Sequence, residues 1–166
     1  MRLGQYHRVT EVNERAALAD RAYAEIVEPG PIYLMYAAHN HHFLAAGAMM
    51  EGRSELALAA ARETAATIPA EHLRHTPEMD AFIIQPVLTL VRFGRWSEVL
   101  AEPPPPADMA YPTALWHHAR GMAFASTGQL AEAQEALDFV AHTGGDVAFR
   151  ACRRHAERDS RQVPRH

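Results

Sequence analysis

Single glycines that separate helix-forming stretches constrain the fold of this chain more than any other feature. Gly52, Gly94 and Gly128 each follow an apolar stretch with helical spacing and precede another. They lie 42 and then 34 residues apart. Glycine suits a helix end because it readily adopts the left-handed backbone conformation that closes the last turn. The pattern predicts successive antiparallel helical hairpins, and residues 39–69 form the clearest one.

Apolar spacing and turn-forming residues predict helices along most of the chain. Thr10 is expected to cap the first helix, and Pro29-Gly30-Pro31 to end it. Pro86 lies inside a later helical stretch and predicts a kink or a short break. No segment alternates as a strand would. The expected helices cover residues 10–28, 32–51, 54–69, 77–92, 96–100, 111–127, 129–142 and 147–159.

Length and composition favour a single domain. The chain has 166 residues, of which 48% are hydrophobic and 22% charged, so it is long enough to bury a sizeable core. Four prolines in a row, Pro103 to Pro106, should form a stiff spacer that makes the middle unit irregular. The expected parts of the single domain 1–166 are an N-terminal helix (1–31), repeat 1 (32–69), irregular repeat 2 (76–106), repeat 3 (111–143) and a basic C-terminal helix and tail (146–166).

Charge and hydropathy exclude two classes of partner. The formal net charge is −4, which argues against a nucleic-acid footprint. No apolar run approaches the roughly 20 residues of a membrane helix, and the first residues lack the apolar centre of a signal peptide. Cys152 is the only cysteine, so no intrachain disulfide forms. We therefore expect a cytoplasmic protein without nucleic-acid or membrane partners.

The residues around the three turn glycines follow a common pattern. Positions where helices should touch hold mostly small side chains, which let two backbones approach, and a larger neighbour fills the gap. Seven residues before the glycine stand Ala45, Val87 and Gly121; four before it stand Ala48, Leu90 and Phe124; five after it stand Ala57, Val99 and Ala133.

On these residues the chain resembles the tetratricopeptide repeat (TPR) family, over roughly residues 32–142. The best matching unit is Ala119-Arg-Gly-Met-Ala-Phe-Ala-Ser-Thr-Gly128 with Glu132-Ala133, and Gly94-Arg95-Trp96 is also typical. The amino-acid sequence around the turns further resembles part of longer bacterial TPR proteins. The resemblance implies an all-α, right-handed α-solenoid of about three helical hairpins with flanking helices. It also implies a concave groove lined by the first helix of each hairpin.

The resemblance places groove positions thirteen, ten, six and three residues before each turn glycine. We expect a non-catalytic scaffold that binds a protein or peptide in this groove, without a cofactor. His41 falls outside the groove, at a position that packs against the partner helix. The expected groove residues are His39, His42, Met49, Ile84, Gln85, Leu88, Arg92, His118 and Met122.

Two other hypotheses remain open. His39 and His42 are three residues apart and share a helix face, and His118 lies on a different helix. Three converging imidazoles would suit zinc or another transition metal, possibly in a metal-dependent enzyme. The stronger His-Glu-x-x-His pattern is absent, so whether the protein is an enzyme stays uncertain. The third hypothesis is a structural module that forms homo-oligomers through an exposed apolar face.

Overall fold

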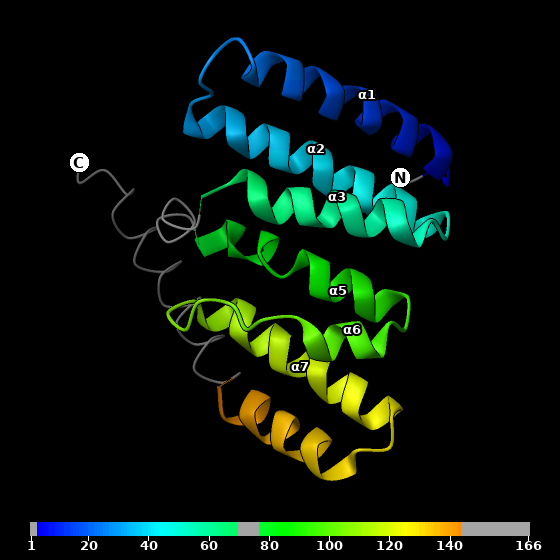
Figure 1. Ribbon diagram of the computed structural model, residues 1–166, viewed down its shortest axis with the longest axis vertical. Coiled ribbons are helices and arrows are strands. Elements are labelled where there is room, and N and C mark those ends of the chain that lie inside the picture. Colours follow the sequence, from blue (N-terminus) through cyan, green and yellow to red (C-terminus); the bar gives the residue numbers. More distant parts are fainter. Residues whose placement is uncertain (1–2, 70–76, 144–166) are drawn as a thin grey trace, which may run out of the picture.

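The computed structural model describes residues 3–69 and 77–143, and all regular secondary structure within these ranges is helical (Figure 1). The predicted all-α class is confirmed. The expected helix 147–159, and with it Cys152, lies outside the described residues. The elements are α1 (Tyr6–Ala24), α2 (Pro31–Met50), α3 (Ser54–Thr67), the 3₁₀ helix η1 (Pro77–Phe82), α5 (Gln85–Arg92), α6 (Trp96–Ala101), α7 (Ala110–Ser126) and a further helix over 130–143.

The helices follow one another through space in the order in which they occur in the chain, from α1 at one end of Figure 1 to residues 130–143 at the other. α2 packs between α1 and α3, and α6 packs on α7. Alternate helices also meet, because α2 contacts α5 and α5 contacts α7. The first helix of each hairpin therefore lies against the first helix of the next.

All three turn glycines close their helices with the same geometry. Gly52, Gly94 and Gly128 have φ of 74°, 65° and 79°, a region that side chains with a Cβ rarely enter. The residue after each glycine donates its backbone N–H to the carbonyl five residues earlier, and the glycine donates to the carbonyl three residues earlier. This is the Schellman arrangement. The three glycines that separate the predicted helices thus adopt the same turn conformation.

The first helix differs from its prediction. α1 begins at Tyr6 and ends at Ala24, rather than covering residues 10–28. Thr10 is fully buried inside the helix, where its hydroxyl donates to the Glu51 carboxylate at 2.7 Å. It is not a cap, because its side chain is used at the crossing of α1 and α2. Gly47 makes that crossing close, since a Cβ there would lie 2.7 Å from the Thr10 hydroxyl.

Hydrogen bonds to Asp20 form a second polar contact between α1 and α2. Asp20 of α1 accepts hydrogen bonds from the Tyr33 hydroxyl at 2.7 Å and from the Asn40 side-chain amide at 2.8 Å. The hydrogen bond to Asp20 is the main cause that raises the pKa of Tyr33 to about 12. Asn40 and Tyr33 are seven residues apart on α2, so they mark the side of that helix that faces α1.

The middle unit is irregular for reasons visible in its sequence. Pro86 does not kink a continuous helix; a 3₁₀ helix ends at Phe82, and α5 begins at Gln85 with the proline in its first turn. The missing N–H of proline is tolerated there. The six-residue α6 then ends before the proline run. Trp116 of α7 donates its indole N–H to the carbonyl of Glu102 at 3.2 Å and anchors the start of that run.

The largest core cluster lies where α3, α5, α6 and α7 meet. Its fully buried members include Leu90 of α5, Val99 of α6 and Ala119 of α7, each 0% exposed. A second cluster joins α2 to α3 through Ala45 and Ala61. Within the described part of the chain, no helix is both long and apolar enough to cross a membrane.

Candidate binding face

The helix α2 has one side that no other described helix covers. Its other sides are used: Tyr33 and Asn40 contact α1, Ala45 packs on α3, and His42 lies against η1. The uncovered positions follow one another at alternating spacings of four and three residues, which is a single helix face. They are Ile32, Tyr36, His39, Phe43, Ala46 and Met50. Large side chains on this stripe are exposed, with Ile32 at 72%, Tyr36 at 61% and Met50 at 51%.

The helix α7 has a comparable uncovered side. Arg120 faces α6, where it donates to the Leu100 carbonyl at 2.7 Å. His117 faces residues 130–143, where its ring stacks on Phe139 with centroids 3.7 Å apart. Ala119 and Ala123 point into the core. The large side chains of α7 that remain exposed, four or seven residues apart, are Tyr111, His118 and Met122.

Between these two helices, α5 contributes three further side chains. Leu88 is half-buried and packs against the main core cluster with one side. Gln85 is half-buried and donates its side-chain amide to the Ala81 carbonyl at 3.2 Å. Arg92, in the last turn, is exposed. Their spacing of three and four residues puts them on one face of α5.

Because α5 contacts both α2 and α7, the three uncovered sides adjoin one another. We call this surface the binding face. It combines aromatic rings and thioethers with imidazole, amide and guanidinium groups. Its residues are Ile32, Tyr36, His39, Phe43 and Met50 of α2; Gln85, Leu88 and Arg92 of α5; and Tyr111, His118 and Met122 of α7.

Most of the groove residues expected from the sequence lie on this face, but Ile84 does not. Ile84 is 1% exposed within the main core cluster, so no ligand can reach its side chain. His42 and Met49 are half-buried beside the face. The expected positions in α2 follow a line rotated toward α5, where η1 packs and covers His42.

Five residues of the binding face were not expected: Ile32, Tyr36, Phe43, Met50 and Tyr111. The four in α2 share the four-three spacing that passes through His39. That spacing is present in the sequence and places the four residues on one side of a helix. It does not by itself show which side of a uniformly apolar helix is left uncovered, and α2 has no charged residue to mark its solvent side.

His42 sits in an aromatic environment that keeps its ring neutral. Its ring lies 5.5 Å from that of Phe82 and 6.2 Å from that of Phe43, measured between centroids. Burial lowers the pKa of His42, and the nearby His39 lowers it further. The Nδ1 atom is buried without a hydrogen-bond partner in the described structure. His42 therefore acts as part of the apolar wall beside the face.

His41 precedes His42 on α2 and faces away from the binding face. It is 9% exposed, as expected for a position that packs against the partner helix, and its Nδ1 atom also lacks a partner among the described residues. Burial is the main cause that lowers the pKa of His41, while Glu63 and Asp20 act in the opposite direction.

Metal ligation requires side chains that converge, and the three candidate imidazoles are not arranged in this way. Over residues 3–69 and 77–143, no group of three or more His, Cys, Asp or Glu side chains is placed to hold a metal ion. His39 and His118 lie on α2 and α7, with α5 between them. On this face they are separate polar groups.

Comparisons of the chain with protein-family models, with curated proteins and with solved structures give no significant match. Functional inference therefore depends on the geometry and chemistry of the binding face.

Proposed function

We propose that the chain is a non-catalytic binding module for a segment of another protein, built as a tetratricopeptide-like right-handed helical array. In this proposal α2, α5 and α7 are the first helices of three hairpins, and the binding face is the inner surface of the array. The segment lies across the face and contacts all three helices.

The repeated turn geometry supports the array. Three helices end with the same pair of Schellman hydrogen bonds at Gly52, Gly94 and Gly128. The small side chains on either side of the turns serve the same purpose in the first two units, since Ala45 and Ala57 are at most 1% exposed and Val99 is 0% exposed. Equivalent positions thus have equivalent packing roles, as expected of a repeat.

The observation that carries the binding proposal is the exposed stripe on α2. Ile32, Tyr36 and Met50 are more than half exposed on one side of a helix whose other sides are packed. Tyr111 and Met122 extend this apolar surface on α7, at 44% and 40% exposure. Single exposed apolar residues are ordinary, but a group of them on α2 and α7, with the half-buried Leu88 of α5 between the two helices, is typical of an interaction surface. Tyrosine contributes large area with few rotatable bonds, and methionine adapts to different partners.

Selection of random displayed peptides on the immobilised full chain tests this proposal. Selected peptides should lose most of their binding to a Tyr36→Ala/Met122→Ala variant, because both side chains lie on the face. Both are exposed, so the fold should persist, and thermal unfolding followed by circular dichroism checks this.

A Val12→Ala/Leu18→Ala variant is the matched control. These two side chains are 45% and 62% exposed on α1, a helix that contributes no residue to the face, so binding should be retained. Peptides that bind equally to both variants would refute the proposal. Concentration-dependent light scattering in the same samples shows whether a second copy of the chain occupies the face instead.

A further inference from the structure

Acidic residues are missing from the three helices that form the binding face. The chain has 20 Asp and Glu residues, yet none lies within α2, α5 or α7, which are 20, 8 and 17 residues long. Every other described α-helix carries at least one. These acids are Glu11, Glu14 and Asp20 in α1; Glu55 and Glu63 in α3; Glu98 in α6; and Glu132, Glu135 and Asp138 in residues 130–143.

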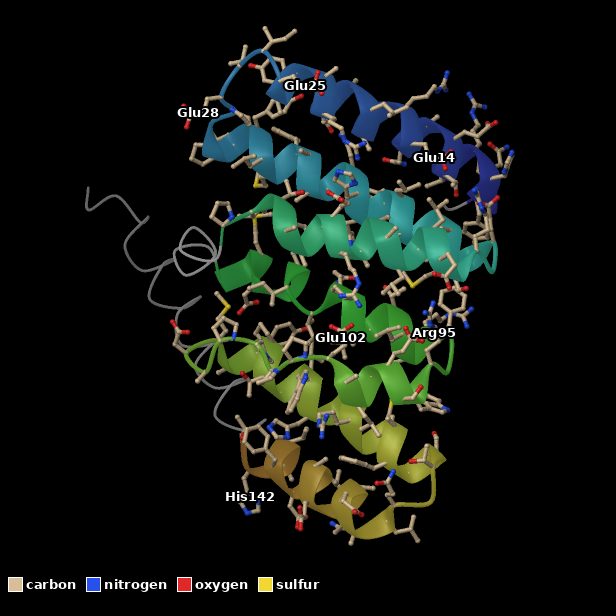
Figure 2. All side chains as sticks on the ribbon, viewed as in Figure 1. Glu14, Glu25, Glu28, Arg95, Glu102 and His142 are labelled. Atoms are coloured by element: carbon tan, nitrogen blue, oxygen red, sulfur yellow. The ribbon has the colours of Figure 1, made fainter. Side chains whose placement is uncertain are left out.

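In the acidic helices most of the carboxylates have structural partners. Arg95, at the start of α6, binds Glu98 of the same helix at 2.5 Å and Glu55 of α3 at 2.7 Å. Arg62 of α3 binds Glu102, at the end of α6, at 2.5 Å. The hydrogen bond from Arg95 lowers the pKa of Glu98. Figure 2 labels Arg95 and Glu102 among these side chains. The acids therefore tie α3 to α6 and leave the face-forming helices without a negative charge.

The cationic and imidazole groups on the binding face have no such partners. Arg92, His39 and His118 are exposed, and none of them forms an ion pair with a described residue. Two acids near the face already have partners. Asp80 of η1 is half-buried and interacts within the protein, and the Glu51 carboxylate, one residue after Met50, is hydrogen-bonded to Thr10 and His7 of α1.

From this distribution we infer that the binding face takes an acidic amphipathic segment, with Asp or Glu side chains beside its apolar ones. The inference rests on the proposed function and names the class of its ligand. A neutral segment that covered Arg92 would offer its guanidinium only uncharged carbonyl oxygens and no negatively charged acceptor, so the contact would be weaker. A carboxylate supplies that acceptor, and the imidazoles of His39 and His118 offer further N–H donors.

The same distribution works against basic segments. Lysine or arginine side chains on the ligand would meet Arg92 and find no carboxylate on α2, α5 or α7. Like charges brought together at an interface reduce affinity for the wrong partner. The overall charge of the chain is −4 and would by itself attract basic peptides. A preference for acidic peptides would therefore report the local charge of the face.

The peptides selected in the display experiment supply the test. Those that depend on Tyr36 and Met122 should contain more Asp and Glu than the unselected library, and fewer Lys and Arg. Binding of individual synthetic peptides should weaken about tenfold or more in Arg92→Glu, because one attractive contact becomes a repulsive one. The loss should shrink when the salt concentration is raised.

An Arg15→Glu variant is the matched control. Arg15 is exposed on α1 and the substitution changes the net charge by the same amount, so affinity should stay within about twofold of that of the unsubstituted chain. A repeated selection on Arg92→Glu should shift toward basic peptides.

The outcomes separate the inference from the function on which it rests. Face-dependent peptides without acidic enrichment, or equal losses in Arg92→Glu and Arg15→Glu, would overturn the inference and leave the binding module intact. The absence of any face-dependent peptide would overturn both.

Discussion

α3 and α7 pack against the same short helix, α5, but they use charge in opposite ways. α3 reaches α6 through two Arg–Glu contacts, Arg62 with Glu102 and Glu55 with Arg95. α7 also has an arginine directed at α6, but no acid in residues 3–69 or 77–143 forms an ion pair with it. The guanidinium of Arg120 lies 4.6 Å from the ring centroid of Trp116 and 5.1 Å from that of Phe124, and it donates to a backbone carbonyl.

This difference shows that helix pairing here does not require acids on every helix. Cation–π contacts and a carbonyl hold Arg120 in place of a carboxylate. Among the described α-helices, the acids lie on α1, α3, α6 and residues 130–143, and the face-forming helices α2, α5 and α7 have none.

Substitutions on the packed side and on the exposed side of the face-forming helices should differ most in their effect on stability. Leu90→Ala on the packed side of α5 should lower the free energy of unfolding by about 2–5 kcal/mol, since its side chain is 0% exposed. Met122→Ala on the exposed side of α7 should change it by about 0.5 kcal/mol or less. Urea unfolding measures both. Similar losses at the two positions would mean that the binding face is buried in solution.

The acidic helix α1 and the face-forming helix α2 come into close contact at Gly47. Gly47→Ala places a methyl group against Thr10 and should cost about 1–3 kcal/mol of unfolding free energy. Thr10→Ala removes the clashing hydroxyl, so the double variant should lose less than the sum of the single losses. A double-mutant cycle in urea measures this coupling, and strict additivity would argue against the contact.

A neutral imidazole in the α2–α3 contact predicts a pH effect on stability. Burial lowers the pKa of His41 below its ordinary value of 6.5, so the unfolded chain takes up a proton on this ring before the folded chain does. Its contribution to stability is complete above pH 6.5 and is lost as the pH falls. The urea midpoint should drop between about pH 7.5 and 5.5, in part because of this ring.

In His41→Leu that drop should become smaller, because the titrating group is gone. His118→Gln is the control, since it removes an imidazole that is exposed on the binding face rather than buried. Equal pH dependence in His41→Leu and the unsubstituted chain would show that the ring is not held neutral.

Removal of an ion pair between the acidic helices should have the smallest effect on the free energy of unfolding. Arg62→Gln breaks the ion pair with Glu102, and because the Arg62 side chain is 53% exposed the loss should be about 0.2–1 kcal/mol. The difference from the unsubstituted chain should narrow at high salt, where the pair is screened. A loss as large as that of Leu90→Ala would show that ion pairs, rather than packing, hold α3 against α6.

Local signals in the sequence were sufficient for the helices and their turns. Gly52, Gly94 and Gly128 end helices as expected because a left-handed closing residue is a property of the residue itself. Thr10 was misread because a threonine near a helix start has the same local pattern whether it caps the helix or donates across a helix crossing. Only the position of Glu51 on the neighbouring helix decides between them.

The binding face was predicted in part for a related reason. His118 was placed by counting back from its turn glycine, as the resemblance implies, and Arg92 was placed at the border of the middle set of groove positions. The burial of Ile84 could not be predicted, because an apolar residue at a groove position looks the same as a core residue until the neighbouring helices are placed. Tyr36 and Phe43 were missed for the converse reason, since nothing local distinguishes an exposed aromatic ring on an apolar helix from a buried one.

The three identical turn closures also bear on how fast the chain folds. Each closure joins two helices that are consecutive in the chain, and the helices find their packing partners among close neighbours in sequence. Little chain entropy is lost in bringing such neighbours together, and proteins dominated by local contacts fold rapidly. Folding is therefore expected to start at the turn of any one hairpin and to spread to the next, without a single obligatory nucleus.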